Sequence, residues 1–168
     1  AGSDASGVTT RITRDGDDWR IDGHKRWTTY GRTAGLFLVL GRTAQGPTAL
    51  LVERDTPGLR TEPIDDLIGI RASMTADVHL EDCRVPGGNL LARPGLGVSH
   101  VVGAALDLGR YTVGWGCVGI LDACLEAAVD YAGRRRQFGS LIKEHQLVRR
   151  MISDMYTDAR AARLLCLE

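Results

Sequence analysis

The apolar residues of this sequence change their spacing once, near Pro94-Gly95-Leu96-Gly97, and this change divides the chain into two parts of different kinds. Before it, apolar residues alternate with polar ones or form short runs between turn residues, which is typical of β-strands. After it, residues 98–132 contain no proline and repeat small and apolar residues at helical spacing. We therefore predict an α+β protein with a β-domain at 1–95 and a helical domain at 96–168.

The first part has the strand and turn signals of an antiparallel β-sandwich or barrel-like domain. The predicted strands are residues 8–13, 19–21, 36–40, 49–52 and 78–82. Asp15-Gly16 lies between the first two strands and is a strong hairpin signal. The runs at 36–40 and 49–52 are continuously apolar, which predicts strands buried on both faces.

The second part predicts two long helices of an incomplete helical bundle. The first would be roughly 50 Å long, and each glycine in it costs about 1 kcal/mol relative to alanine. We expect these glycines to allow close contact with a neighbouring helix or ligand: Gly103, Gly109, Gly114, Gly116 and Gly119.

The second helix is predicted from about Leu141 to the end, with Ser140 as its N-cap. One stripe of this helix carries small and apolar residues at steps of three and four: Val148, Ile152, Met155, Ala159, Ala162 and Cys166. Two helices cannot cover each other on all sides. We expect further helices from additional chain or from other subunits.

Composition excludes several classes of function. Acidic and basic residues number 21 each, so a nucleic acid or an anionic membrane is not an expected partner. The four cysteines form no CxxC pair and no metal-ligand spacing, and Cys117 and Cys124 are interpreted as small apolar residues within a helix. No unbroken apolar run reaches the ~18 residues of a membrane span, and no signal peptide is visible. These features predict a reduced, cytoplasmic protein without a structural metal or a membrane span.

The chain begins with Ala1-Gly2-Ser3-Asp4 and has no initiating methionine, so we expect a fragment of a longer protein. One motif matches a dinucleotide fingerprint, Gly114-Trp115-Gly116-Cys117-Val118-Gly119. It falls within a predicted helix rather than at a strand-to-helix turn, and a Rossmann site is therefore rejected.

Two further motifs each allow a structural and a functional interpretation. Arg134-Arg135-Arg136-Gln137-Phe138-Gly139 could cap a helix that ends at Gly139, or it could bind phosphate through its guanidinium groups while Phe138 packs on a ring. Gly23-His24-Lys25-Arg26-Trp27-Thr28-Thr29 could be ordinary sheet packing or one wall of a site for a flat ligand with a polar edge. Spacing alone does not decide either case.

The order of the motifs resembles the acyl-CoA dehydrogenase family, from its middle β-domain into the first helices of its C-terminal domain. The resemblance covers essentially the whole chain. Besides the opening Gly2-Ser3-Asp4, the segment around Trp27 and the arginine-rich segment, it rests on Thr56-Pro57-Gly58, Leu67-Ile68-Gly69-Ile70-Arg71-Ala72-Ser73, Arg84-Val85-Pro86, Leu108-Gly109-Arg110 and His145-Gln146.

The resemblance implies an FAD enzyme that removes a proton from Cα of an acyl thioester while a hydride passes from Cβ to flavin N5. It implies an acyl-CoA or acyl-carrier-protein thioester as substrate, electron-transfer flavoprotein or another acceptor as redox partner, and a homo-oligomer, either dimer or tetramer. The implied cofactor contacts are Ser3, Trp27, Thr28, Thr29, Arg135, Gln137, Phe138, His145 and Gln146. The implied substrate contacts are Ser3, Asp107 and Arg110.

Within this set the resemblance places Trp27 and Thr29 beside the isoalloxazine, with Thr29 near N5. It assigns the segment from Arg135 to Phe138 to the cofactor of a neighbouring subunit. His145 and Gln146 match a further cofactor contact.

Two departures from the family concern activity. Most members carry the catalytic glutamate in a later region, and a minority carry it on the first long helix, where this chain has Gly109. Asp107 is offset from that position, so no catalytic residue is assigned, and the base is expected in an absent C-terminal segment. The family's N-terminal helical domain is also missing. We expect the fragment alone to bind FAD weakly and to turn over little or nothing.

Three segments resemble the branch of the family that acts on carrier-protein-bound extender units in polyketide pathways: Trp115-Gly116-Cys117-Val118-Gly119-Ile120, the arginine-rich segment, and Ala161-Ala162-Arg163-Leu164-Leu165-Cys166-Leu167. In that case Arg84 or Arg93 would face an acidic helix of the carrier. Two alternatives stay open, a non-catalytic flavin-binding or scaffolding fragment and an acyl-CoA oxidase-like or nitroalkane-oxidase-like enzyme.

Overall fold

The computed structural model describes residues 2–168, so Ala1 of the opening motif lies outside the described residues. The chain divides between Ala105 and Leu106 into two compact units. They are termed the β-unit (to Ala105) and the helical unit (Leu106–Glu168), and each is described by itself.

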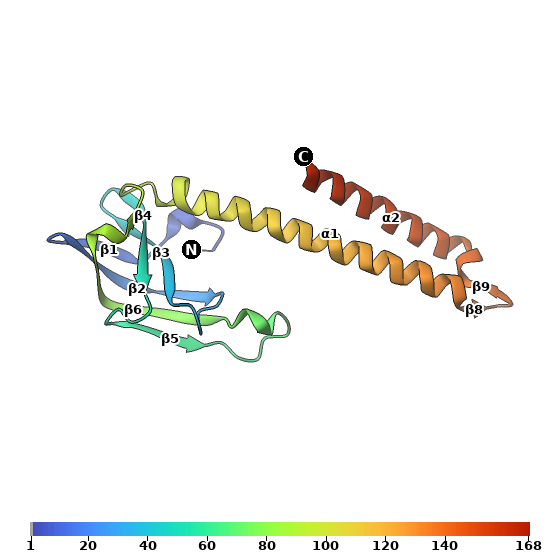
Figure 1. The fold of residues 1–168 in the computed structure, drawn as a ribbon, viewed down its shortest axis with the longest axis horizontal. Helices are drawn as coiled ribbons and strands as arrows, with labels where there is room; N and C mark the ends of the chain where they lie inside the picture. The colour runs from blue at the N-terminus through green and yellow to red at the C-terminus, as the bar shows by residue number, and fades with distance from the viewer. Residues whose placement is uncertain (1) are drawn as a thin grey trace. The chain divides into compact units, whose positions relative to one another are not determined.

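The β-unit contains a seven-stranded sheet with the strand order β5-β6-β2-β1-β3-β4-β7 (Figure 1). The strands are β1 (Arg11–Asp15), β2 (Asp18–Thr28), β3 (Leu36–Thr43), β4 (Gly46–Glu53), β5 (Leu59–Pro63), β6 (Ala76–Val85) and β7 (Leu90–Leu91). All neighbouring strands are antiparallel except β1 and β3, which meet in parallel at the single pair Arg11 and Arg42. The α+β fold class is confirmed, with a sheet that is mixed because of this one pair.

The predicted hairpin at Asp15-Gly16 is confirmed, since Asp15 of β1 pairs with Asp18 of β2. Gly16 has a φ of 61°, a left-handed conformation that glycine adopts without steric cost. This explains why the Asp-Gly signal marks the turn.

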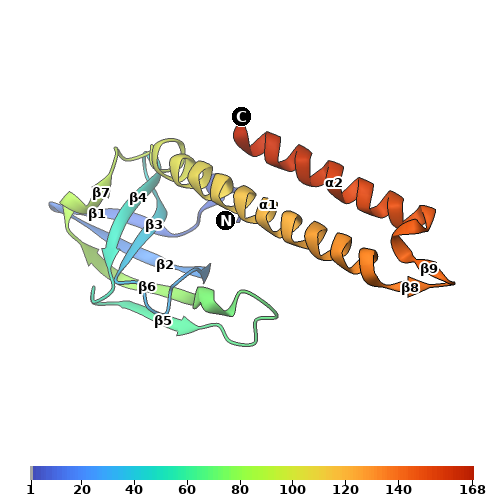
Figure 2. The ribbon, with the colours of Figure 1, turned by 45° about the vertical axis from the view of Figure 1, so that its right-hand side comes forward.

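The inward faces of the strands share one hydrophobic core. Figures 1 and 2 show β3 and β4 running across the direction of β2 and β6, and buried side chains from both strand pairs form one cluster. Its members are Ile12, Trp19, Ile21, Phe37, Val39, Leu50, Val52, Val78, Leu80, Cys83 and Val85. Burial of this apolar surface, at about 25 cal/mol per Å², is the main source of the unit's stability.

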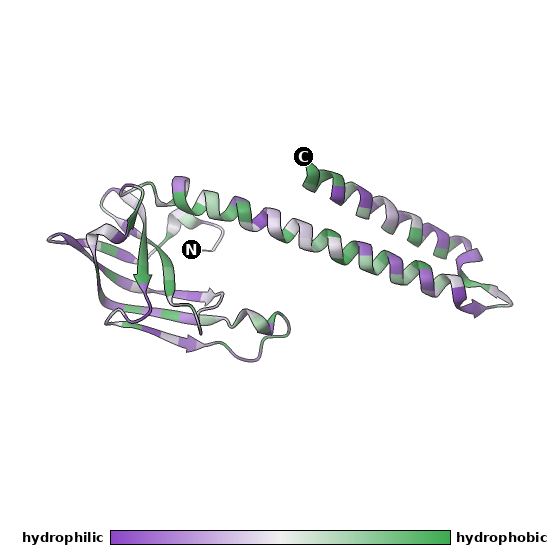
Figure 3. Ribbon diagram, viewed as in Figure 1, coloured by the Kyte–Doolittle hydropathy of each residue, from purple (hydrophilic) through white to green (hydrophobic). Residues whose placement is uncertain are grey.

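The prediction that residues 36–40 are buried on both faces is wrong. Figure 3 shows β3 as largely apolar, but its side chains alternate: Phe37 and Val39 are buried, whereas Leu36 and Leu38 are 51% and 46% exposed. A continuous apolar run indicates that the side chains on both faces of a strand are apolar. It does not indicate whether other residues cover both faces. β4 is closer to the prediction, with Ala49, Leu50 and Val52 buried.

The helical elements are α1 (Gly103–Arg134), which follows the π-helical segment η4 (Gly97–Val102), and α2 (Gln146–Leu167). Between them lie the short strands β8 (Arg136–Gln137) and β9 (Ser140–Leu141) and the 3₁₀ turn η5 (Ile142–Glu144). The fingerprint-like motif at Gly114–Gly119 falls inside α1, so the prediction that it lies within a helix is confirmed.

The predicted stripe on α2 is confirmed, because Ala159 is buried and its other members are half-buried. A Cβ on Gly114 would lie 3.3 Å from Cys166 Sγ, whereas one on Gly109, Gly116 or Gly119 would meet nothing within 4 Å among the described residues. Close helix contact at a glycine is thus seen at Gly114. Many apolar side chains of both helices remain exposed, and the expected additional helices stay a prediction.

Two details of the predicted helices are wrong. Ser140 does not cap α2, because α2 begins at Gln146 and His145 occupies the cap position without a side-chain hydrogen bond. Gly139 does not end α1, which stops at Arg134. Cys117 and Cys124 lie within α1, as predicted, and both are exposed.

Residues Gly97–Arg134 are long and apolar enough to cross a membrane, judged by length and composition only. The prediction of no membrane span counted unbroken apolar runs, whereas average hydropathy over a helix tolerates a few charges. Core helices of soluble proteins pass the same test, so this property is weak support for a membrane location.

Candidate functional site

Trp27 lies at an irregularity in the pairing of β2 with β6. Lys25 pairs with Val78 and Thr28 with Ala76, so β2 contains one extra residue in between. Trp27 has a φ of 61°, a left-handed conformation that costs a bulky residue about 1–2 kcal/mol. Its indole is 56% exposed, and the Arg26 guanidinium carbon lies 5.1 Å from the ring centre. The indole is therefore outside the core, which argues against ordinary sheet packing.

Two threonines follow this indole in the chain. Thr28 ends β2 and is half-buried, whereas Thr29 lies beyond the strand and is exposed. Among residues 2–168, no group hydrogen-bonds to the N–H or the hydroxyl of Thr29. An exposed aromatic face next to two free polar groups fits a flat ligand with hydrogen-bonding edges.

Lys25, in the same segment, connects β2 to β3. Its Nζ donates a hydrogen bond to the backbone oxygen of Leu40 at 2.5 Å. Burial lowers the pKa of Lys25 to about 8, because the charged ammonium is poorly solvated there. The sequence motif contained this lysine, but its spacing did not indicate the contact.

Beside this segment, the rings of His24 and His79 stack across β2 and β6 with their centres 4.4 Å apart. His24 Nε2 lies 3.4 Å from Asp77 Oδ2, and His79 Nε2 lies 3.4 Å from Glu62 Oε2. In the described part of the chain, no group of three or more His, Cys, Asp or Glu side chains is arranged to hold a metal ion. The two rings form a stacked pair on the sheet, with Asp77 and Glu62 beside them.

Ser3 lies in an exposed turn at the start of the β-unit. The next residue, Asp4, accepts a hydrogen bond from the Gly7 backbone through Oδ1 at 3.1 Å and caps a short 3₁₀ turn, η1 (Ala5–Gly7). This local bond shapes the loop and leaves the Ser3 side chain directed to solvent.

In the helical unit, β8 and β9 form a hairpin whose two turn residues are Phe138 and Gly139, with φ values of 52° and 80°. Positive φ at both positions is typical of the type I′ turn. Phe138 is 96% exposed, and its ring is nearly perpendicular to the His145 ring, with the two ring centres 6.1 Å apart. His145 Nε2 also lies 3.3 Å from the Gln137 backbone oxygen. The structure thus brings together Gln137, Phe138 and His145.

Arg135 and Arg134 differ in their contacts. The backbone of Arg135 connects α1 to the hairpin, since its N–H donates to Tyr131 and its oxygen accepts from Ile142, both at 2.9 Å. Its guanidinium has no ion-pair partner within residues 2–168, whereas Arg134 pairs with Asp130 at 3.0 Å. Arg135 is therefore the freer cation, and Gln146 follows nearby as the first residue of α2.

Asp107 and Arg110 are exposed on the first turns of the helical unit and form a loose ion pair at 3.8 Å. Gly109 lies between them in the sequence. A solvated carboxylate paired with a neighbouring arginine on its own helix has none of the burial that tunes catalytic bases. The geometry does not favour Asp107 as a base.

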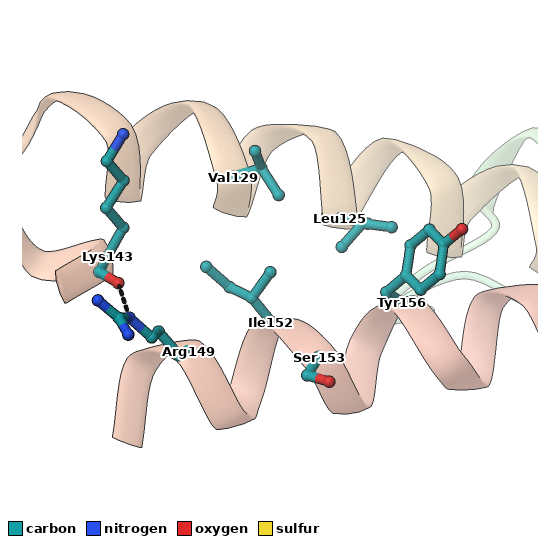
Figure 4. A pocket seen from close by; sticks show the side chains of 7 residues that line it. All are labelled: Leu125, Val129, Lys143, Arg149, Ile152, Ser153 and Tyr156. Atoms are coloured by element: carbon teal, nitrogen blue, oxygen red, sulfur yellow. Dashed lines mark hydrogen bonds between the residues drawn. The ribbon is translucent and has the colours of Figure 1, made fainter. Parts of the chain in front are cut away.

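The helical unit also contains a groove of about 520 Å³ between α1 and α2 (Figure 4). Leu125 and Val129 of α1 and Ile152 of α2 project into it, and at one end Arg149 Nε donates to the Lys143 backbone oxygen at 3.1 Å. None of the site residues predicted from the sequence lines this groove. Its lining residues include none of Gln137, Phe138 and His145.

Comparison with known families identifies two matching domains. The family profile described as "Acyl-CoA dehydrogenase, middle domain" matches residues 1–83. The profile described as "Acyl-CoA dehydrogenase, C-terminal domain" matches residues 96–168.

Individual proteins match over nearly the whole chain. A probable acyl-CoA dehydrogenase, FadE25 of Mycobacterium tuberculosis, is 38% identical over 170 residues, which are 98% of this chain and 43% of that protein. The chain therefore spans less than half the length of this relative.

Two solved structures are similar in fold and sequence. The structure titled "FkbI for Biosynthesis of Methoxymalonyl Extender Unit of Fk520 Polyketide Immunosuppresant" has a TM-score of 0.88 and 44% identity, covering 99% of this chain and 47% of that one. A glutaryl-CoA dehydrogenase from Mycobacterium smegmatis in complex with FADH2 has a TM-score of 0.89 and 30% identity, covering 99% and 42%.

Proposed function

The chain belongs to the acyl-CoA dehydrogenase family, and from this we propose that it is part of a longer FAD-dependent enzyme that forms a double bond between Cα and Cβ of an acyl thioester. The observation that carries the proposal is the exposed, left-handed Trp27 next to the free polar groups of Thr29. Bulky residues held in such a conformation cluster at functional sites, where the surrounding structure maintains the strain.

FAD is the cofactor of this family, and the residues fit it in two places. Trp27 offers a flat apolar face for the isoalloxazine, and Thr29 offers an N–H and a hydroxyl for the ring edge. Arg135 offers a guanidinium fork for the pyrophosphate, and Phe138 offers an exposed ring for a flat base. Bound FAD would supply a hydride acceptor at flavin N5.

The roles of this chain's own residues follow from these contacts. Trp27 excludes water from one face of the ring, and Thr29 holds the ring edge by hydrogen bonds. The end of the cofactor that is distant from the isoalloxazine is held by Arg135, Gln137, Phe138 and His145. By the family resemblance, these residues contact the cofactor of a neighbouring copy of the chain. Thr28, Ser3 and Gln146 complete the proposed cofactor contacts.

On the substrate side, the proposal assigns Ser3, Asp107 and Arg110 as contacts, and Arg110 binds the polar part of the thioester. Removal of the Cα proton requires a general base within hydrogen-bonding distance of it, which by the family resemblance is a carboxylate. Asp107 is exposed and faces Arg110. The proposal therefore locates the base outside residues 1–168.

The proposal is tested by purifying the longer enzyme of which this chain is proposed to be part, with its cofactor, and adding an acyl-CoA under nitrogen. The yellow flavin absorbance is expected to bleach, and an electron-accepting dye or electron-transfer flavoprotein is expected to restore it. A protein that retains no flavin would leave only a scaffolding role. Rapid peroxide formation in air would instead favour an oxidase.

FkbI, at 44% identity, serves the biosynthesis of a polyketide extender unit. Together with the resemblance of three segments to the carrier-protein branch of the family, this favours a carrier-protein thioester as a second candidate substrate. Of the two arginines considered for the carrier, Arg84 already pairs with Asp18 at 2.9 Å. Arg93 is exposed and makes no ion pair within residues 2–168, so it is the better contact for an acidic carrier helix. To test this, the same acyl group is presented once on CoA and once on a carrier protein, under nitrogen. The thioester that bleaches the flavin absorbance faster is the preferred substrate.

A further inference from the structure

Arg54 directly follows β4, and its side chain contacts the turn that connects β2 to β3. Nη1 donates to the backbone oxygens of Gly31 at 3.2 Å and Ala34 at 2.9 Å. Nη2 donates to the backbone oxygen of Arg32 at 2.8 Å and to Thr61 Oγ1 at 3.1 Å. The four terminal N–H groups of one guanidinium thus serve four acceptors, three of them in a single turn.

This arrangement depends on the planar shape of the guanidinium, which fixes the directions of its donors. The Phe37 ring lies 6.0 Å from the Arg54 guanidinium carbon, on the core side. The backbone is also anchored, because the Arg54 N–H donates to the Gly35 oxygen at 2.9 Å. Arg54 is therefore held in place by β4 and the core while it binds the turn.

The turn itself has a conformation that needs outside support. Tyr30 is left-handed, with a φ of 55°, and a Cβ on Gly31 would lie only 2.9 Å from the Ala76 Cβ. Two backbone bonds hold one side of the turn, Tyr30 N–H to the Ser73 oxygen at 2.7 Å and Arg32 N–H to the Met74 oxygen at 3.2 Å. Arg54 holds the other side.

Thr29 immediately precedes this turn and lies outside the strand. The orientation of its N–H and hydroxyl therefore depends on where the turn is fixed. We propose that Arg54 is a positioning residue for the Trp27–Thr29 wall of the cofactor site: its guanidinium fixes the turn and thereby the donors of Thr29. This inference rests on the proposed function, since the wall is assigned there to the flavin.

Hydrogen exchange of the cofactor-free protein tests the first step. Replacement of Arg54 by alanine is expected to speed the exchange of the Tyr30, Arg32 and Ala34 amides by about tenfold or more, because local opening of the turn becomes easier. Arg60→Ala is the matched control, since Arg60 is an exposed arginine that contacts Glu62 and Glu81 and no residue of the turn. It is expected to leave these amides unchanged.

The second step is tested on the cofactor-loaded protein. Arg54→Ala is expected to raise the Kd for FAD about tenfold and to shift the flavin absorption bands, which report hydrogen bonds at the ring edge. Arg54→Lys is expected to behave like the alanine variant, because an ammonium cannot reach all three carbonyls. Millimolar methylguanidinium is expected to restore the bands of the alanine variant, whereas a general loss of stability would not be reversed in this way.

The outcomes separate this inference from the proposed function. If the wild-type longer enzyme binds no FAD, the proposed function fails and this inference with it. If the wild type binds FAD but Arg54→Ala has unchanged FAD affinity and absorption bands, or unchanged exchange in the turn, only the role of Arg54 is overturned.

Discussion

At the scale of single residues, the two aromatic side chains of the proposed cofactor site share an unusual backbone conformation. Trp27 and Phe138 have φ values of 61° and 52°, and both rings are more than half exposed. Aromatic residues gain nothing for the fold from being left-handed and exposed. We infer that these conformations serve to present the rings to a ligand.

Replacement of Trp27 by glycine is expected to stabilise the fold by up to about 1 kcal/mol, because relief of the left-handed penalty of about 1–2 kcal/mol exceeds the entropy that glycine adds to the unfolded chain. The same change is expected to weaken FAD binding at least about tenfold. Urea unfolding and FAD titration measure the two effects. Ala92→Gly is the control, since Ala92 is also exposed with a φ of 61° and should not affect FAD. A loss of more than about 2 kcal/mol in Trp27→Gly would mean that the indole packs in the fold.

Lys25 is expected to titrate with a midpoint near pH 8, below its ordinary pKa of 10.5, because burial disfavours the ammonium. Between these two pH values the unfolded chain binds more protons than the folded one. The contribution of Lys25 to the free energy of unfolding therefore rises with pH across this window. Below pH 8 the buried ammonium lowers the free energy of unfolding by its full amount. Carbon NMR of the lysine side chains measures the midpoint directly, because Lys25 and Lys143 are the only lysines. Lys143→Met assigns the signals, and a single midpoint near 10.5 for Lys25 would contradict its burial.

At the scale of elements, the hairpin of β8 and β9 determines how the side chains from Arg134 to Gly139 are arranged. The sequence allowed a helix cap ending at Gly139, but α1 stops at Arg134 and Gly139 completes a two-residue turn. The hairpin carries Phe138 to its tip and sets Gln137 beside His145. A helix would have distributed the same residues around its circumference.

In the longer enzyme, Arg135→Ala is expected to lower the FAD content of the purified protein several-fold, and Arg134→Ala to change it little. The reason is that Arg134 is engaged with Asp130 at 3.0 Å, whereas Arg135 has no ion-pair partner among the described residues. Flavin absorbance per protein measures the content. Equal losses in the two variants would indicate that the cluster contributes only general positive charge.

At the scale of the whole molecule, the proposed cofactor residues are divided between the two units. Ser3 and Trp27 to Thr29 belong to the β-unit, and Arg135 to Gln146 belong to the helical unit. If a neighbouring copy supplies the second set, each cofactor site is shared between two chains, and the oligomer is necessary for binding.

Shared sites predict complementation between two defective variants. Trp27→Ala and Arg135→Ala are each expected to bind FAD poorly, but a mixed dimer contains one site in which both residues are native. Unfolding and refolding the two variants together should therefore recover FAD binding, and mixing them without subunit exchange should not. Absorbance of the refolded mixture measures this, and no recovery would indicate that both residues act within the same chain.

Several features of this protein could be predicted from the sequence because they depend on local chemistry. Asp15-Gly16 marks a turn since few residues adopt positive φ, and the stripe on α2 marks a buried face since helical spacing places its members together. The ordered motifs identify the family in the same way, each by residue type and position.

Other features were decided only by tertiary structure. The exposed face of β3, the lowered pKa of Lys25 and the contacts of Arg54 with the Gly31–Ala34 turn depend on strands that are distant in the sequence. The hairpin after α1 depends on Phe138 accepting a left-handed conformation, which no local preference of phenylalanine predicts. The spacing of residues reveals which side chains share a face of one element, but coverage, desolvation and long-range hydrogen bonds arise only when separate elements meet.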